Sequence, residues 1–347
     1  MFDNELLIIR GGEVLSLLAD RELEIVTLVQ EAYEAHGRGH SSLPHSVFLR
    51  FPNDPRNRII ALPGHLDGKF NVAGIKWISS FPGNHEVGQD RASAVVILNS
   101  MATGRPFSIL EGSIISAKRT AASAALAARY LQSAEKATVL SLVGCGVINF
   151  EIARFVLATC PEVKTLVVFD KDVSIAEQFK NRCEQEFKEV EVRVVDELNR
   201  LLSNATLISL ATTASEPYIF DLSMCARDCT VLNVSLRDLA AEVILASDNV
   251  VDDVDHVCRA QTSVHLAEQV AGNRDFIRCT LSEVTSGVAR ARRERNKPLV
   301  FSPFGLGVLD LALGQLVYEL AREEKLGTAM GQFLAPQWTQ RSIENAA

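Results

Sequence analysis

A glycine turn, Gly144-Cys-Gly146, stands directly between an apolar run and a stretch of helix-forming residues. Residues 139–143 are typical of a buried strand, and residues 149–159 are typical of a helix. In such a turn Gly144 permits a tight change of direction, and Gly146 lets the backbone approach a phosphate group beside the helix N-terminus. The third glycine of the dinucleotide-binding pattern is missing, because Asn149 stands in its place. The predicted pyrophosphate contacts are Gly144, Gly146, Val147 and Ile148.

An aspartate ends the next strand-like run along the chain. Residues 165–169 are apolar or β-branched, and Asp170 follows them. A carboxylate at this position accepts hydrogen bonds from ribose hydroxyls and repels a 2′-phosphate. The pattern therefore predicts NAD rather than NADP as the cofactor. The alternative is an ordinary glycine turn with a surface aspartate.

Two basic residues lie in stretches that are otherwise suited to burial. Lys76 occurs in Val-Ala-Gly-Ile-Lys-Trp-Ile, and Arg119 occurs in Ser-Ala-Lys-Arg-Thr-Ala-Ala-Ser. A buried lysine needs a carboxylate partner and can have a lowered pKa. The alternatives are a lysine that reaches solvent at a sheet edge and an arginine on a helix surface. We predict Lys76 and Arg119 as catalytic and substrate-binding residues.

Two further arginines, Arg50 and Arg91, are also predicted to bind substrate. A guanidinium group binds a carboxylate through two parallel hydrogen bonds. The four cations together predict a pocket for a small molecule with several carboxylates.

Other kinds of site find little support in the sequence. The histidines His36, His40 and His45 are predicted to be solvated in a Gly/Ser-rich loop, and no metal site is expected. The seven cysteines are scattered, which argues against a disulfide framework and for a reducing cytoplasm. A net charge of −8 disfavours nucleic acid and anionic membranes as partners. The N-terminus has no basic region typical of a signal peptide, and no apolar run reaches the roughly 18 residues needed to span a bilayer.

The elements that must position these residues form two groups. Up to about residue 125, several strands beside one or two helices predict an α+β substrate-binding and dimerisation domain. A helix over 111–132, rich in alanine and serine, is expected to lead out of it. Residues 126–305 alternate strictly between strand and helix and predict a Rossmann-type, doubly wound parallel sheet that binds NAD. A C-terminal helix within 306–347 is expected to return and complete the first domain.

These residues resemble the ornithine cyclodeaminase/mu-crystallin family over nearly the whole chain. The matching strings are Gly74-Ile-Lys-Trp, Thr103-Gly-Arg-Pro, Arg119-Thr-Ala-Ala, Gly144-Cys-Gly, Asp170 and Gly305-Leu-Gly-Val-Leu-Asp310. The resemblance implies that Lys76 and Arg119 hold a substrate carboxylate beside the nicotinamide. It also implies that Thr120 lies near the cofactor and that the chain is a homodimer through its first domain. We further predict cofactor contacts at Thr212 and Asn233.

Two departures separate the chain from the cyclodeaminases of that family. Ser46 stands where those enzymes carry an arginine, and Leu236 stands where they carry a catalytic aspartate, with Asp238 two residues away. One branch, the N-((2S)-2-amino-2-carboxyethyl)-L-glutamate dehydrogenases, shares these departures. The chain is similar to that branch at Arg58-Ile-Ile-Ala-Leu-Pro, Arg91-Ala-Ser, Val95-Val-Ile-Leu-Asn, Asp252-Asp and Cys258-Arg.

The resemblance to this branch implies an NAD-dependent oxidative cleavage that releases L-2,3-diaminopropionate and 2-oxoglutarate and forms NADH. Lys76 is the first candidate for the base. The product would supply siderophore or non-ribosomal peptide biosynthesis, and a PLP-dependent synthase would make the substrate. The alternatives are another amino-acid or imine dehydrogenase, an ornithine cyclodeaminase, or a non-catalytic binding protein like mu-crystallin.

Overall fold

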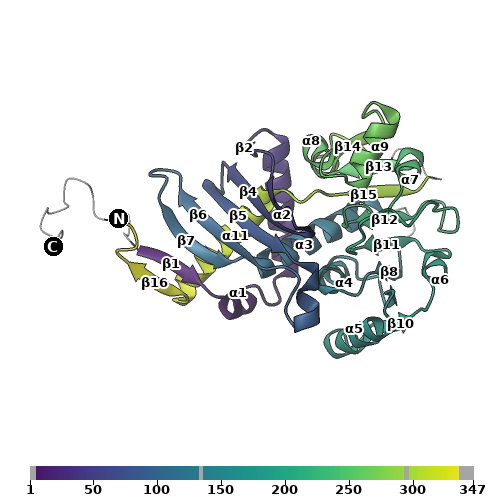
Figure 1. The fold of residues 1–347 in the computed structure, drawn as a ribbon, viewed down its shortest axis with the longest axis horizontal. Helices are drawn as coiled ribbons and strands as arrows, with labels where there is room; N and C mark the ends of the chain where they lie inside the picture. The colour runs from purple at the N-terminus through teal and green to yellow at the C-terminus, as the bar shows by residue number, and fades with distance from the viewer. Residues whose placement is uncertain (1–4, 133–135, 293–296, 336–347) are drawn as a thin grey trace, which may run out of the picture.

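A computed structural model describes residues 5–132, 136–292 and 297–335 of the chain. Two eight-stranded sheets stand at opposite ends of the molecule, with helices between them (Figure 1). We call the elements on the first sheet the first lobe and those on the second sheet the second lobe. The helices at their junction are α2 (Glu22–Gly37), α3 (Ser113–Leu131) and α4 (Val147–Thr159).

The first sheet has the strand order β16-β1-β7-β6-β5-β4-β2, and β3 also pairs with β4. All its pairings are antiparallel except the one between β1 and β7. Its strands are β1 (Glu5–Ile9), β2 (Ser41–Ser42), β3 (Val47–Phe51), β4 (Asp54–Leu66), β5 (Val72–Ser80), β6 (Ala94–Ser100), β7 (Pro106–Glu111) and β16 (Thr328–Gly331).

One face of the first sheet is covered by helix α11 (Gly307–Glu324), which packs along β4, β5 and β6. Strand β6 shows the consequence: Ala94, Val96 and Leu98 are buried, whereas Val95 between the first two is exposed. Alternate side chains of a strand point to opposite faces, so the even-numbered residues of β5 and β6 face α11. Lys76, the partner of Val96 in the register, therefore lies on the covered face.

Strand β4 continues through Pro63 and Gly64, residues typical of turns, and pairs with β5. Gly64 lies opposite Gly74, and a Cβ atom on either would come within 3.2 Å of a side-chain atom of α11. The two glycines therefore let the helix approach the sheet closely. Glycine breaks a strand pattern in the sequence but here marks a close contact.

The second sheet is entirely parallel, with the order β10-β9-β8-β11-β12-β15-β13-β14. The Rossmann-type sheet predicted from the sequence is confirmed. The order reverses direction between β8 and β11, which is where doubly wound sheets bind ligands. Its strands are β8 (Val139–Val143), β9 (Thr165–Phe169), β10 (Glu191–Val194), β11 (Leu207–Leu210), β12 (Thr230–Asn233), β13 (Asp248–Val251), β14 (Ile277–Thr280) and β15 (Leu299–Ser302).

The remaining helices are mostly short connections around the two sheets. They are α1 (Gly11–Leu17), the 3-10 helix η1 (Pro82–Val87), α5 (Val173–Glu186), α6 (Leu198–Leu202), α7 (Ala241–Ala246), α8 (Val254–Val257), α9 (Ser263–Ala271) and α10 (Leu281–Thr285). None of the helices in the described part of the chain combines the length and apolar character needed to cross a membrane.

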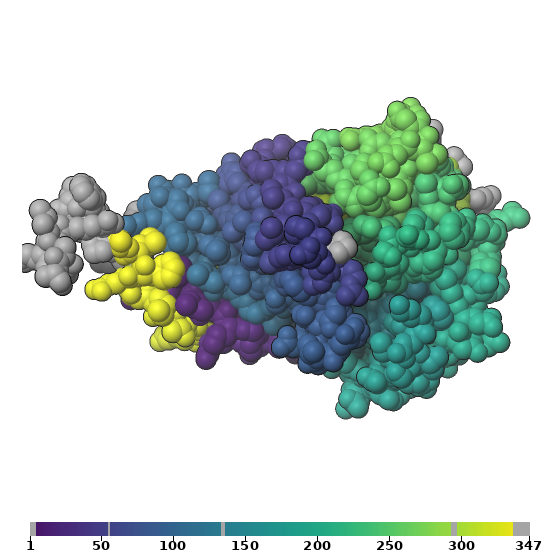
Figure 2. Space-filling model, viewed as in Figure 1, coloured from purple at the N-terminus to yellow at the C-terminus, as the bar shows by residue number. Residues whose placement is uncertain are grey.

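The C-terminal segment returns to the first lobe, but not only as a helix. After α11 ends, β16 pairs with β1 and extends the first sheet. Figure 2 shows this segment, in yellow, lying against the N-terminal segment in purple. Residues 336–347 of the predicted C-terminal helix lie outside the described residues. The division into domains at residues 125 and 305 stays a proposal.

Candidate active site

The glycine turn after β8 has the geometry that its sequence predicts. Gly144 has φ +91°, and a Cβ atom there would lie 2.6 Å from the carbonyl oxygen of Ala211. Gly146 is the N-cap of α4, and a Cβ atom on it would meet nothing within 4 Å. Val147 and Ile148 form the first turn of this helix. The turn therefore presents open backbone and free N–H groups at the switch point of the sheet.

Asn149, which replaces the third glycine, ties the turn down. Its side chain is fully buried, and its Nδ2 donates to the carbonyl oxygens of Val143 at 2.8 Å and Gly144 at 2.7 Å. Its Oδ1 accepts a hydrogen bond from Ser209 Oγ at 2.7 Å. The side-chain amide of Asn149 thus holds the turn in place through hydrogen bonds. The sequence, in which Asn149 only counted as a missing glycine, did not suggest this role.

Asp170 lies beside this turn at the carboxyl end of β9. Its Oδ2 accepts from the N–H of Cys145 at 2.9 Å, and its Oδ1 accepts from the N–H of Asp172 at 3.1 Å. A carboxylate oxygen has more than one acceptor site, so each oxygen can still accept from a ribose hydroxyl. The geometry fits the predicted role, which stays a prediction.

Replacing Asp170 with serine is expected to narrow the preference for NAD over NADP by about tenfold, because the repulsion of a 2′-phosphate is lost. The ratio of kcat/KM for the two cofactors measures this. Asp172→Asn is the matched control, since the Asp172 carboxylate instead caps α5 through Ser174. An unchanged ratio in Asp170→Ser would remove this residue from the ribose site.

The predicted cations Lys76 and Arg119 meet at one buried carboxylate. Lys76 Nζ lies 2.8 Å from Asp310 Oδ2, and Arg119 Nε lies 3.1 Å from Asp310 Oδ1. Lys76 comes from β5, Arg119 from α3 and Asp310 from the first turn of α11. All three are buried, with 2%, 7% and 0% of their surfaces exposed. The alternatives of a solvated lysine and a surface arginine are therefore wrong.

The surroundings of this Lys76–Asp310–Arg119 cluster tune its charges. Burial, together with the charge of Arg119, lowers the pKa of Lys76 to about 8, against the opposing effect of Asp310. Ser116 Oγ accepts from Lys76 Nζ at 3.1 Å. Gly305, with φ +93°, passes so close that a Cβ atom would lie 2.8 Å from Arg119 Nη1. The cluster can hold an anion beside an amine that loses its proton near neutral pH.

Asp310 is a site residue that the sequence reasoning did not assign. It occurs in the matching string Gly305–Asp310, but it is far from Lys76 and Arg119 along the chain. One local feature could have suggested it, namely a lone carboxylate among the apolar residues of the first two turns of the helix.

The remaining predicted cofactor residues lie on elements around the switch point. Thr120 Oγ1 donates to the carbonyl oxygen of Ser116, and Thr212 Oγ1 donates to Asp238 Oδ1 at 2.7 Å. Asn233 ends β12, and its buried Oδ1 has no hydrogen-bond partner within the described ranges. An orphaned buried acceptor and an open glycine turn suit a bound dinucleotide.

Asp238 is not a free replacement for the aspartate that Leu236 lacks. It is fully buried, and it accepts hydrogen bonds from Thr212 Oγ1 and from Tyr218 Oη, the latter at 3.0 Å. Burial raises its pKa. These contacts give Asp238 a role in holding two loops together.

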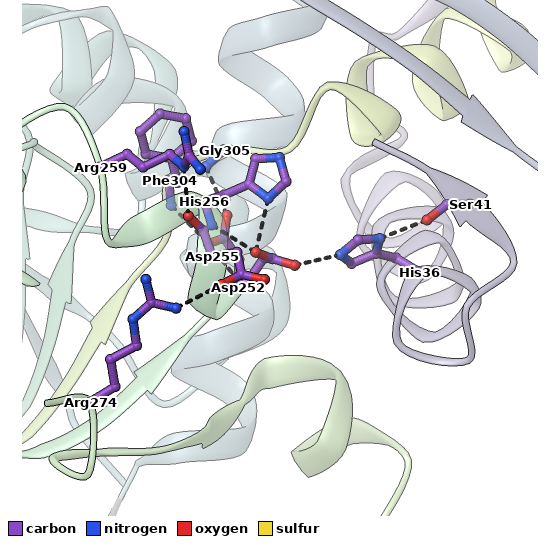
Figure 3. Close-up of polar contacts among 10 residues, drawn as sticks. His36, Ser41, Asp252, Asp255, His256, Arg259, Arg274, Phe304 and Gly305 are labelled. Atoms are coloured by element: carbon purple, nitrogen blue, oxygen red, sulfur yellow. Dashed lines mark hydrogen bonds and ion pairs between the residues drawn. The ribbon is translucent and has the colours of Figure 1, made fainter. Parts of the chain in front are cut away.

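A polar network joins the two lobes on the other side of Gly305. His36 Nε2 lies 3.0 Å from Asp253 Oδ2, and His256 Nδ1 lies 2.9 Å from Asp253 Oδ1 (Figure 3). The neighbouring Asp252 accepts from the N–H groups of Phe304 and Gly305 at 2.9 and 2.8 Å. Burial opposes ionisation of Asp253, but the hydrogen bonds from the two histidines outweigh it and hold its pKa well below the ordinary value. The network fixes the loop that passes Arg119.

This network corrects the prediction that His36 is solvated in a loop. His36 lies within α2, its side chain is 16% exposed, and its Nδ1 contacts Ser41 Oγ at 2.7 Å. Its partner Asp253 is remote in sequence, so no local pattern marked it. The described residues contain no group of three potential metal ligands from His, Cys, Asp or Glu.

Comparisons with known proteins agree with this architecture. The model of the ornithine cyclodeaminase/mu-crystallin family matches residues 14–325. The N-((2S)-2-amino-2-carboxyethyl)-L-glutamate dehydrogenase of Staphylococcus aureus is 26% identical over 95% of this chain and 100% of its own. The Δ(1)-pyrroline-2-carboxylate reductase of Thermococcus litoralis, solved with NADH and L-proline, is 22% identical with a TM-score of 0.87, over 93% of this chain and 99% of its own. An archaeal alanine dehydrogenase dimer with bound NAD is 24% identical with a TM-score of 0.84, over 95% and 100%.

Proposed function

Because the chain belongs to the ornithine cyclodeaminase/mu-crystallin family, we propose that it is an NAD-dependent oxidoreductase acting on a carbon–nitrogen bond. Its proposed reaction is the oxidative cleavage of N-((2S)-2-amino-2-carboxyethyl)-L-glutamate to L-2,3-diaminopropionate and 2-oxoglutarate. The observation that carries the proposal is the pair of buried cations, Lys76 and Arg119, held by Asp310. The similarity to the Staphylococcus aureus dehydrogenase supports the choice of substrate.

The second lobe would hold the cofactor. The pyrophosphate would bind at Gly144, Gly146 and the first turn of α4. Asp170 would accept hydrogen bonds from the adenosine ribose, and the Oδ1 of Asn233 would accept one from a donor group at the other end of the dinucleotide. NAD, when bound, supplies the hydride acceptor. The relatives solved with NADH and NAD support this assignment.

The first lobe would hold the substrate. Arg119 and Lys76 would bind the carboxylate beside the reacting carbon, and among the described residues both form their ion pair with the same carboxylate, Asp310. With a pKa of about 8, Lys76 can take the proton of the substrate amine and then orient the water that cleaves the carbon–nitrogen bond. Burial of the cluster keeps bulk water away from these charges.

The direct test mixes the purified protein, NAD and the synthetic conjugate and follows NADH absorbance. The main alternative is a related amino-acid or imine dehydrogenase, and the likeness to an alanine dehydrogenase supports this alternative. Adding alanine in place of the conjugate separates the two. NADH formation from alanine alone would overturn the proposed substrate.

We also propose that the chain forms a homodimer through the uncovered face of the first sheet. One row of residues crosses this face, with each member directly opposite the next on the neighbouring strand: Val47 on β3, Ala61 on β4, Trp77 on β5 and Val95 on β6. The three large members of this row are 65%, 42% and 38% exposed. A contiguous apolar row on a sheet face is typical of a protein–protein interface.

Replacing Trp77 with glutamate is expected to convert the dimer to a monomer, because the charge would have to be buried in the interface. Sedimentation velocity measures the change. Val87→Glu, at an even more exposed apolar residue on η1, is the control and should leave the dimer intact. A dimer that persists in Trp77→Glu would place the interface elsewhere.

The cellular role is proposed on chemical grounds. The conjugate is a secondary amine, so another enzyme must join its two halves, and a PLP-dependent synthase is the class suited to that step. The product diaminopropionate would enter siderophore or non-ribosomal peptide biosynthesis in the cytoplasm. Accumulation of the conjugate in cells that lack this chain would support this role, and its absence would count against it.

A further inference from the structure

A row of arginines lies on the covered face of the first sheet, farther along β5 than Lys76. Arg50 on β3 pairs in register with Arg58 on β4, and Arg58 pairs with Ser80 on β5. Arg91 Nη1 donates to Ser80 Oγ at 2.8 Å. Residues directly opposite on antiparallel strands share a face, and so do residues four apart on one strand. Arg58 and Ser80 therefore lie on the same face as Lys76, about 13 Å farther along the sheet.

A fourth arginine comes from the second lobe. Arg237 lies in the loop that follows β12, and its Nη1 and Nη2 donate to the carbonyl oxygens of Ser215 and Ala260, both at 3.2 Å. These bonds leave its Nε buried without a partner. Arg237 is close enough to Arg50 and Arg58 for their charges to repel.

These four arginines, which we call the arginine cluster, have no ion pair with a carboxylate among the described residues. The Nε of Arg58 is also buried without a hydrogen-bond partner. Burial lowers the pKa of Arg58, and the charges of Arg91, Arg237 and Arg50 lower it further. Like charges gathered without a counter-ion are unfavourable, and a bound anion would remove this penalty.

We propose that Arg58 and Arg237, together with Arg50 and Arg91, bind the distal carboxylate of a dicarboxylic substrate. This proposal rests on the proposed function, because it places the other carboxylate of the same molecule on Lys76 and Arg119. For one small dicarboxylate to span both sites, the long side chains at the two ends would have to reach toward each other across the roughly 13 Å that separate them along the sheet. Arg58 and Arg237 come from different lobes, so the ligand would also bridge the lobes.

A carboxylate fits this cluster better than a cofactor phosphate does. Three of the four arginines stand on or beside the first sheet, whereas the phosphate-binding turn lies at the end of β8 in the second sheet. The guanidinium fork matches a carboxylate with two parallel hydrogen bonds. The cluster would therefore make the enzyme select acids with two carboxylates over acids with one.

The test compares 2-oxoglutarate with pyruvate as ligands of the full-length protein saturated with NADH, by isothermal titration calorimetry. The native protein should bind 2-oxoglutarate at least tenfold more tightly than pyruvate. Arg58→Gln and Arg237→Gln should each weaken 2-oxoglutarate binding by tenfold or more and leave pyruvate binding unchanged. Arg56→Gln is the control, because the Arg56 side chain is 75% exposed and its ion pair with Asp54 is long, at 3.9 Å.

The outcomes separate this proposal from the proposed function. Equal binding of both acids by the native protein, or unchanged 2-oxoglutarate binding in both variants, would overturn the arginine cluster even where the conjugate is oxidised. Loss of 2-oxoglutarate binding in the variants, without oxidation of the conjugate by the native protein, would support the cluster and overturn the proposed reaction. NADH binding by each variant verifies its fold. If Arg58→Gln fails to fold, Arg58→Lys replaces it, because lysine keeps the charge but lacks the guanidinium fork.

Discussion

Lys76→Met and Arg119→Met are each expected to lower kcat/KM for the conjugate by at least a thousandfold while the protein stays folded. The substrate carboxylate would lose a buried, charged partner, and Lys76→Met would also remove the amine that takes the proton. The fold should survive, because the remaining cation still neutralises Asp310. NADH formation measures the first effect, and urea unfolding measures the second.

Removing the carboxylate of Asp310 is expected to destabilise the fold, whereas removing either cation is expected to leave the protein folded. Asp310→Asn would leave Lys76 and Arg119 buried together without a counter-charge, at a cost of about 3–5 kcal/mol in the free energy of unfolding. Glu319→Gln, an exposed position later in α11, is the control and should change stability little. Near-normal kcat/KM in Arg119→Met, or unchanged stability in Asp310→Asn, would contradict this account of the cluster.

The pH dependence follows from the same cluster. The neutral amine of Lys76 is the form that accepts a proton, and its pKa is lowered to about 8. Therefore kcat/KM of the native enzyme should rise as the pH increases toward 8 and level off above it. A profile that is flat between pH 6 and 9 would assign the proton to another group.

Ornithine with NAD is expected to yield no proline, whereas the conjugate yields NADH and 2-oxoglutarate in equal amounts. The resemblance to the family implies that ring closure of ornithine needs an aspartate at the position where this chain has Leu236. An apolar side chain cannot accept a proton, and nearby Asp238 is fully buried and engaged by Thr212 and Tyr218.

The equal yield follows from the balance of the reaction. The conjugate, NAD⁺ and water give diaminopropionate, 2-oxoglutarate, NADH and one proton, so each carbon–nitrogen bond cleaved releases one hydride. A cyclodeaminase would return the hydride and accumulate no NADH. Absorbance and product chromatography on the same sample measure both quantities. Proline formation at a rate comparable to conjugate oxidation would refute the assignment to Leu236 and to this reaction.

Local patterns in the sequence predicted much of the fold. The sequence predicts strands over residues 139–143 and 165–169, and both are strands with those bounds. The glycine turn after β8 was also predicted, because a turn with positive φ depends on the residue itself and its immediate neighbours. The burial of Lys76 followed from the apolar residues on either side of it.

Contacts between distant segments had no such local pattern. Asp310 meets Lys76 and Arg119 only because α11 returns across β5, and Asp253 meets His36 only because the lobes come together there. The close contact that the paired glycines of β4 and β5 allow depends on helix α11, which is distant in sequence. The short strand β16 was missed because its exposed residues depend on pairing with β1.

The sequence by itself therefore determined the parallel sheet, the glycine turn and the residue types available for chemistry, since each depends on short-range geometry and periodicity. Only the tertiary structure decided which charges share a site. Asp310 balances Lys76 and Arg119, and Asp238 is confined by its hydrogen bonds. The arginine cluster forms no ion pair with a carboxylate in the part of the chain that the structure describes. The physical reason is that the energy and pKa of a buried charge depend on the groups within a few ångströms of it in the folded chain. Those groups can be far away along the sequence, so no local pattern reveals them.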